Sequence, residues 1–234
     1  MLPLRDHLPT RTFPFVNYAL IAANIVVFFL QSGGAVTDDY AFVPARLFVD
    51  PVWGLQTVFT AMFMHASLAH IGGNMLYLWI FGDNVEDAMG HVRYLVFYLA
   101  GGVCAALAQT FVSPTVPMLG ASGAISAVLA AYALLYPRSP VTVLNPIFIL
   151  WFFFGLFLTF PAWIVIGLFF VVNLFSALGP SGSGGVAFMA HVGGFVGGAV
   201  LLRLFLAGRD RFEDHPRWER WAEPRRRRRA DDYY

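Results

Sequence analysis

The chain has 234 residues, of which 58% are hydrophobic and only 12% are charged, and its formal net charge is +1. Soluble domains carry about 25% charged residues, so the composition excludes an ordinary soluble protein and indicates a membrane protein. Cys104 is the single cysteine, which excludes an intramolecular disulfide and a cysteine-based metal cluster. We expect no metal, no other cofactor and no nucleic-acid partner.

The first apolar run predicts a membrane-spanning helix. Residues 1–11 are polar and include two arginines, whereas residues 12–37 carry no charge and residues 17–30 are almost continuously apolar. A spanning helix needs about 20 mostly apolar residues. We therefore expect residues 1–16 to form a cytoplasmic segment that leads into the first span.

The connection over residues 31–67 is expected to lie flat in the membrane interface. It contains Asp38, Asp39, Arg46 and two prolines, but also many large apolar residues. It is too apolar for a free linker and too interrupted to cross the bilayer.

Three further spans follow before residue 138. The second is expected at 68–81, the third at 94–111, and the fourth from about Ser122 to residue 136. A short charged turn over residues 82–93 separates the second from the third.

The charge-free stretch 139–202 has room for two spans comfortably and three only tightly. We expect the fifth span at 162–178 and the sixth at 191–207. Residues 141–160 would then be an apolar segment that dips into the membrane or lies along it.

The arginines favour six spans. With a cytoplasmic N-terminus, every arginine except Arg46 falls at or beyond a cytoplasmic helix end, as the positive-inside rule requires. A seventh span would place the five arginines at 225–229 outside. We expect a multi-pass protein of a bacterial cell membrane with both termini in the cytoplasm. Residues 208–234 would be a basic, disordered tail that can contact anionic lipids.

Polar residues stand at the start of three spans that run from outside to inside: His70 with Asn74, then Ser122, then His191. They should therefore lie at similar depth below the outer surface. A serine needs a base to become a nucleophile, and His191 is the only histidine in the last three spans. Asn74, His70 and the backbone N–H groups around Ser122 could stabilise an oxyanion. Since these spans contain no acidic residue, the pattern predicts a Ser–His dyad.

Each residue also has a plainer explanation. Ser122 can be a helix N-cap, and a membrane histidine can be a packing contact or part of a proton relay. The combination at one depth favours catalysis. Two G-x-x-x-G steps, Gly193 with Gly197 and Gly194 with Gly198, allow the last helix to approach a neighbour closely. Gly123 and Ala127 provide a matching small face on the fourth span.

Three stretches resemble the rhomboid family of intramembrane serine proteases: HASLAHIGGN at 65–74, GASG at 120–123, and AHVGGFVGG at 190–198. The resemblance covers about residues 17–206. It implies an all-α, six-helix rhomboid-type bundle with an interfacial first loop and a membrane domain over 17–207. It also implies Ser122 as nucleophile, His191 as general base, and His70 and Asn74 with the Ser122 backbone as the oxyanion hole. The resemblance further implies that transmembrane proteins are cleaved near the outer face of the membrane. Such substrates would enter the site past the fifth span, and a flexible loop at 178–187 would cap the site.

Two positions depart from the family pattern. Gln56-Thr57 replaces a Trp-Arg pair of the first loop. Ser126 stands one turn below the nucleophile, where some members have an aromatic residue that supports the histidine. His191 must then be oriented by Ser126, by water or by neighbouring backbone.

Two other functions remain open from the sequence. A non-catalytic scaffold that binds client helices would need the packing glycines but not the serine and histidine together. A transporter with a proton relay through His70 and His191 predicts acidic partners within the membrane, and the spans contain none.

Overall fold

The computed structural model describes residues 2–31, 37–145, 151, 155–178 and 187–207. Each run that the sequence predicted to span forms a helix in it. The six are α1 (Phe15–Gln31), α5 (Leu68–Met89), α6 (His91–Val112), α7 (Ser122–Leu135), α9 (Ala162–Leu178) and α10 (Phe188–Phe205). The expected cap lies almost entirely outside the described residues, and the expected tail at 208–234 lies wholly outside them.

Two of these helices are long and apolar enough to cross a bilayer, namely α6 and α10. Helices α1, α7 and α9 are apolar but shorter, at 14 to 17 residues. Helix α5 has 22 residues, and its last two turns carry Asp83, Glu86 and Asp87. The count of six spans therefore remains a prediction.

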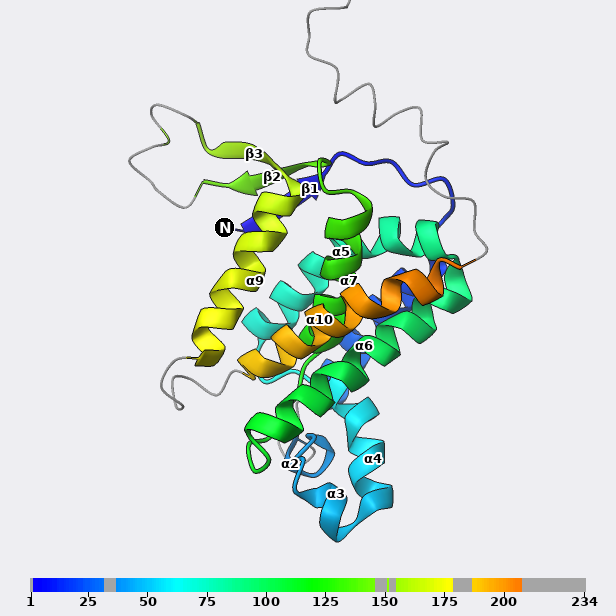
Figure 1. Ribbon diagram of the computed structural model, residues 1–234, viewed down its shortest axis with the longest axis vertical. Helices are drawn as coiled ribbons and strands as arrows, with labels where there is room; N and C mark the ends of the chain where they lie inside the picture. The colour runs from blue at the N-terminus through cyan, green and yellow to red at the C-terminus, as the bar shows by residue number, and fades with distance from the viewer. Residues whose placement is uncertain (1, 32–36, 146–150, 152–154, 179–186, 208–234) are drawn as a thin grey trace, which may run out of the picture.

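Helix α10 packs chiefly against α6 and α7, and Figure 1 shows it passing in front of α7 and running alongside α6. Its paired glycines explain this position. A Cβ at Gly197 would lie 2.5 Å from Cys104 Cβ of α6, and one at Gly198 would lie 2.5 Å from Ala127 Cα of α7. The two small-residue steps thus face two different neighbours, and α10 is held between them by close backbone contact.

The described part of the first connection, residues 37–67, forms three short α-helices and a 3₁₀ turn at one end of the molecule (Figure 1): α2 (Thr37–Tyr40), α3 (Arg46–Val49), α4 (Pro51–Thr60) and η1 (Ala61–Phe63). Phe48 and Val49 are 79% and 87% exposed, yet Phe42 is buried and bridges to Met118 before α7. Large apolar side chains thus face outward from a region fixed to the bundle. This arrangement suits the predicted interfacial position.

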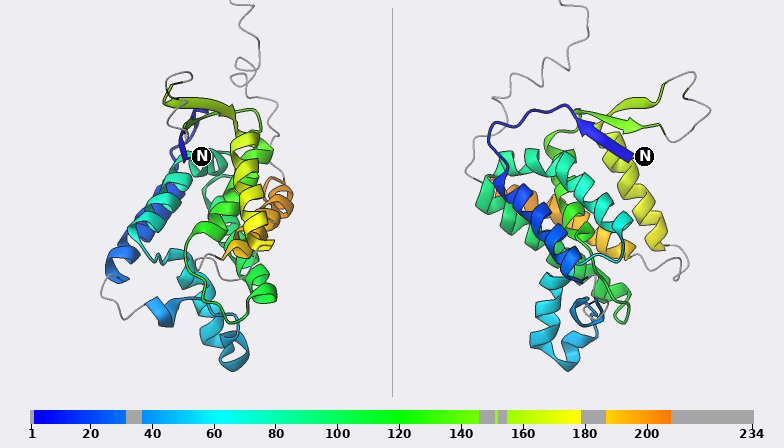
Figure 2. Two further views of the ribbon diagram at one scale, coloured as in Figure 1. Left: turned by 90° about the vertical axis from the view of Figure 1, so that its left-hand side faces the viewer. Right: turned by 180° about the vertical axis from the view of Figure 1, so that it is seen from behind.

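The expectation of an all-α chain is wrong in one respect. Three antiparallel strands, β1 (Leu2–Asp6), β2 (Pro140–Leu144) and β3 (Phe157–Pro161), form a small sheet in the order β1-β2-β3. Figures 1 and 2 place it at the end of the molecule opposite α2–α4. Both ends of the segment 141–160 are therefore paired strands. The apolar residues of this segment are explained in part by β2, because Val141 and Val143 of this strand are fully buried.

A half-buried acidic side chain joins this sheet to the helices. Asp6 Oδ2 accepts hydrogen bonds from the Tyr132 hydroxyl of α7 at 2.7 Å and from Asn84 Nδ2 of α5 at 3.0 Å. Burial raises the pKa of Asp6 to about 7, against the opposing effect of the Tyr132 hydrogen bond. The folded protein therefore favours the protonated carboxyl more than the unfolded chain does.

We expect the attachment of the sheet to weaken between pH 5 and pH 8. The pKa of Asp6 is raised from 3.8 to about 7 on folding, so its contribution to the free energy of unfolding is fully present below pH 4. This contribution is lost as the pH rises through 7. Melting temperatures in detergent at both pH values should show the loss, on the order of 1–2 kcal/mol after allowance for partial exposure. Asp6→Asn should lose much less stability over the same range. An equal pH dependence in parent and variant would contradict this assignment.

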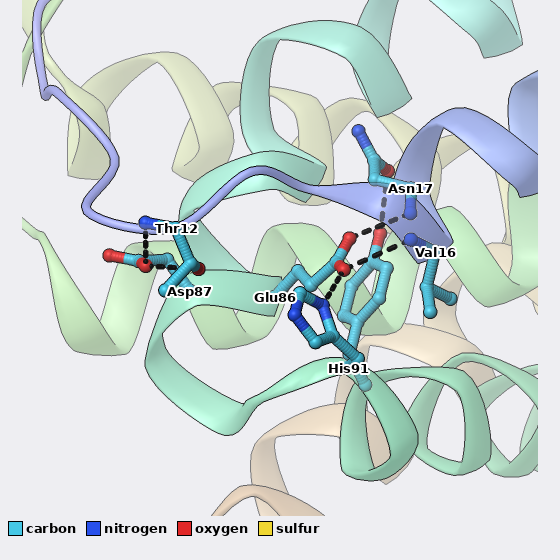
Figure 3. A network of polar contacts seen from close by, with 7 residues as sticks. Thr12, Val16, Asn17, Glu86, Asp87 and His91 are labelled. Atoms are coloured by element: carbon cyan, nitrogen blue, oxygen red, sulfur yellow. Dashed lines mark hydrogen bonds and ion pairs between the residues drawn. The ribbon is translucent and has the colours of Figure 1, made fainter.

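The start of α1 is fixed by the buried carboxylate of Glu86 (Figure 3). Glu86 is fully buried and accepts from the backbone N–H groups of Val16 at 3.0 Å and Asn17 at 2.7 Å. It also pairs with His91 Nδ1 at 2.5 Å. The first N–H groups of a helix have no partner within the helix, so Glu86 supplies one and ties α1 to the α5–α6 turn. Glu86 therefore has a structural function at this turn.

Candidate active site

Ser122 and His191 are in direct contact. Helix α7 begins at Ser122, and His191 is the fourth residue of α10. The distance between Ser122 Oγ and His191 Nε2 is 2.7 Å, a good hydrogen bond. The contact follows from the packing below it, because a Cβ at Gly194 would overlap the carbonyl oxygen of Gly123. Only glycine allows the first turns of these two helices to meet so closely.

The second nitrogen of His191 has a partner that the sequence analysis missed. His191 Nδ1 lies 2.5 Å from Asn173 Oδ1 on α9. Ser126, which was one of the three groups proposed to orient the histidine, instead donates its hydroxyl to the Ser122 carbonyl oxygen at 2.7 Å. The available signal was an amide side chain in the middle of the apolar helix α9, but nothing in the sequence says which way it points.

His70 and Asn74 lie on the first two turns of α5. The side chain of Ser67 caps this helix and accepts from His70 N at 3.1 Å. Asn74 Nδ2 lies 2.8 Å from Nε2 of His65, whose side chain is fully buried. An amide nitrogen carries two hydrogens, so Asn74 keeps a second N–H to donate elsewhere.

The backbone around His65 is clamped by the last residue of α1. Gln31 Oε1 accepts from His65 N at 3.1 Å, and Gln31 Nε2 donates to the His65 carbonyl oxygen. His65 therefore supports Asn74 from a fixed position.

The loop before α7 passes directly over His70. Gly120 has a φ of +119°, which favours glycine, and a Cβ there would lie 2.8 Å from His70 Nε2. Gly120 N donates to the Ala61 carbonyl oxygen at 2.8 Å, which fixes the loop. The backbone that leads to Ser122 thus passes next to the imidazole of His70.

A cavity of about 520 Å³ connects these groups. Its wall includes all four residues that the sequence singled out: His70, Asn74, Ser122 and His191. The first backbone N–H groups of α7 have no partner within the helix and stand beside the serine. One cavity therefore brings together a hydroxyl, an imidazole that can accept its proton, and several hydrogen-bond donors.

This arrangement has the parts that acyl transfer needs. A serine becomes a nucleophile when a neighbouring base takes its proton, and the imidazole can return that proton to a leaving amine. Donors aimed at the developing oxyanion lower the barrier further. Within the part of the chain that the structure describes, no carboxylate contacts His191; its Nδ1 faces an amide instead.

Comparison with known proteins identifies the family of the chain. The model of the rhomboid domain family matches residues 52–208. The Rhomboid protease GluP of Bacillus subtilis is 35% identical over 124 residues, which are 50% of this chain and 24% of that protein. Rhomboid protein 1, mitochondrial, of Saccharomyces cerevisiae is 26% identical over 151 residues, 59% of this chain and 43% of that one.

A human relative, the mitochondrial Presenilin-associated rhomboid-like protein, is 34% identical over 134 residues, covering 53% of this chain and 34% of its own length. The alignments thus span less than half of each of these relatives. The family match, by contrast, covers well over half of the present chain. The protein belongs to the rhomboid domain family.

Proposed function

We propose that the protein is an intramembrane serine endopeptidase that cleaves transmembrane proteins near the outer face of the membrane. Ser122 is the nucleophile and His191 the general base, with Asn74, His70 and the backbone N–H of Ser122 as oxyanion donors. The observation that carries the proposal is the 2.7 Å contact between Ser122 Oγ and His191 Nε2 in a cavity shared with His70 and Asn74.

The proposed reaction follows from these positions. His191 Nε2 accepts the Ser122 proton as Oγ attacks the substrate carbonyl carbon, and the oxyanion forms against the donors of α5 and α7. The imidazolium then protonates the leaving amine, which leaves an acyl-enzyme. Water attacks this ester with His191 again as base, so the acid is released and the serine is regenerated. No metal or ATP takes part.

The proposed topology has six spans with both termini in the cytoplasm. It makes residues 17–207 the membrane domain and places residues 1–16 and the tail 208–234 on the cytoplasmic side. The sheet then lies at the cytoplasmic end and the cavity near the opposite face, within reach of external water. Substrates would enter past α9 and meet the first loop at the interface.

A non-catalytic scaffold is the second candidate, because the family fold alone can bind helices. The tight Ser122–His191 contact favours the protease, since a scaffold has no need of it.

Cleavage of a reporter transmembrane protein in liposomes tests the proposal. We expect two products in the presence of EDTA and without ATP, with the cut, located by mass spectrometry, in the outer part of the reporter's membrane segment. A parallel preparation of Ser122→Ala controls for contaminating proteases. Equal product from both preparations would contradict the serine mechanism, and binding of the reporter without cleavage by either would support the scaffold.

A further inference from the structure

The contact between Asn173 and His191 extends the site to a third residue, on α9. Asn173 is 7% exposed, and the other buried residues of this helix are Ala162, Val165 and Ile166. All four lie on one helix face, directed at the bundle. Asn173 is thus the polar member of an otherwise apolar face that packs against α7 and α10.

The hydrogen bonds of Asn173 fix the orientation of its amide. One end lies 2.8 Å from the carbonyl oxygen of Phe169, one turn earlier in α9. A carbonyl oxygen can only accept, so this end is the NH2 group. The other end, 2.5 Å from His191 Nδ1, is therefore the amide oxygen. The reverse orientation would place two acceptors against each other at Phe169.

This orientation determines the tautomer of His191. Because Asn173 Oδ1 has no hydrogen, the proton of the contact belongs to His191 Nδ1. A neutral imidazole has one N–H, so Nε2 carries the free lone pair, and Nε2 is the atom that faces Ser122 Oγ at 2.7 Å. With the other tautomer, His191 would donate to the serine and could not take its proton.

We infer that Asn173 is the positioning residue of this site, which holds His191 in the tautomer and ring orientation that a general base needs. The inference rests on the proposed function. When His191 becomes an imidazolium, Asn173 Oδ1 still accepts from Nδ1 and its dipole stabilises the new charge. A neutral amide does this without a buried carboxylate, which a membrane interior disfavours.

An asparagine bonded to the carbonyl four residues earlier can also be a purely structural residue. Asn24 of α1 makes the same bond, since its Nδ2 donates to the Leu20 carbonyl oxygen at 2.8 Å, and it is fully buried beside the Tyr98 side chain. The two asparagines make the same bond within their helices. They differ in that the second contact of Asn173 is to the base, His191, so Asn24 is the matched control.

The test compares cleavage kinetics of Asn173→Leu, Asn24→Leu and the parent protein on one reporter substrate. Leucine keeps a branched side chain of similar length and removes the amide. We expect kcat to fall roughly 10- to 100-fold in Asn173→Leu with KM within about twofold, the size typical of lost support for a catalytic group. Asn24→Leu should retain the parent kcat. Equal kcat values for Asn173→Leu and the parent would overturn the inference, as would equal losses in the two variants.

A conservative variant, Asn173→Asp, adds a second measurement, the pH–rate profile, which should not change if Asn173 has only a structural role. Asn173→Asp keeps an oxygen acceptor at Nδ1 but adds a negative charge, which favours the imidazolium. Its kcat at high pH should recover to within about tenfold of the parent, and the acidic limb of its pH–rate profile should move to higher pH. An unmoved acidic limb would contradict direct contact between residue 173 and the base.

Ser122→Ala is measured in the same assay. If that variant cleaves like the parent, the proposed function itself fails, whereas an inactive Ser122→Ala with a fully active Asn173→Leu removes only the positioning role.

Discussion

Replacement of Ser122 by alanine is expected to lower kcat for a reporter transmembrane substrate by roughly four orders of magnitude or more, with little change in KM. The hydroxyl supplies the nucleophile, while the walls of the cavity that bind the substrate are unaltered. His191→Ala should cause a loss of similar size, because Nε2 at 2.7 Å is the base that takes the serine proton.

The double variant distinguishes a dyad from two independent contributions. Residues that act as one unit have non-additive effects, so Ser122→Ala combined with His191→Ala should be no slower than either single variant. Melting temperatures of all three variants control for unfolding. If the losses multiplied, or if His191→Ala retained more than about a tenth of the parent rate, the assignment of the base would be wrong.

A single methyl group at Gly194 is expected to abolish most of the activity. Its Cβ would overlap the carbonyl oxygen of Gly123, which is backbone and cannot rotate away. Helices α7 and α10 must then separate at the level of the site. A shift of about 1 Å in a catalytic contact can reduce the rate 100-fold, and overpacking costs about 1–3 kcal/mol of stability. We expect Gly194→Ala to show both effects.

The matched control is Gly167→Ala on α9, where an added Cβ meets no atom within 4 Å. Alanine has the higher helix propensity by up to about 1 kcal/mol, so this control should be neutral or slightly stabilised and fully active. Cleavage rates and melting temperatures of the two alanine variants decide the question. Unchanged cleavage by Gly194→Ala would show that the close approach of the helices is not required.

The helices and the four residues around the cavity were accessible from the sequence for a simple reason. Charges are excluded from a bilayer interior, so apolar runs mark the helices, and isolated polar residues at matched helix ends stand out. Ser122 and His191 are also flanked by small residues whose spacing predicts close helix contact, and the structure places those residues at that contact.

The sheet and Asn173 were not accessible, for two different reasons. A continuous apolar run can be a strand or a helical segment, so the pattern of residues 141–160 does not distinguish them. The pairing of β2 with Leu2–Asp6 joins two segments that are far apart in sequence. To predict the contact of Asn173 with His191, one must know how α9 is rotated relative to α10. Without this knowledge, Ser126 was named as a candidate, although its hydroxyl bonds within its own helix.

The most direct test of the account is covalent labelling with a serine-reactive phosphonate, followed by peptide mass spectrometry of the intact protein in liposomes. We predict a single adduct on Ser122, absent from Ser122→Ala and formed far more slowly in His191→Ala, because only a hydroxyl next to a base reacts at a useful rate. A preparation that cleaves the reporter but carries no adduct, or carries it on another residue, would contradict the claim that Ser122 and His191 form the catalytic pair.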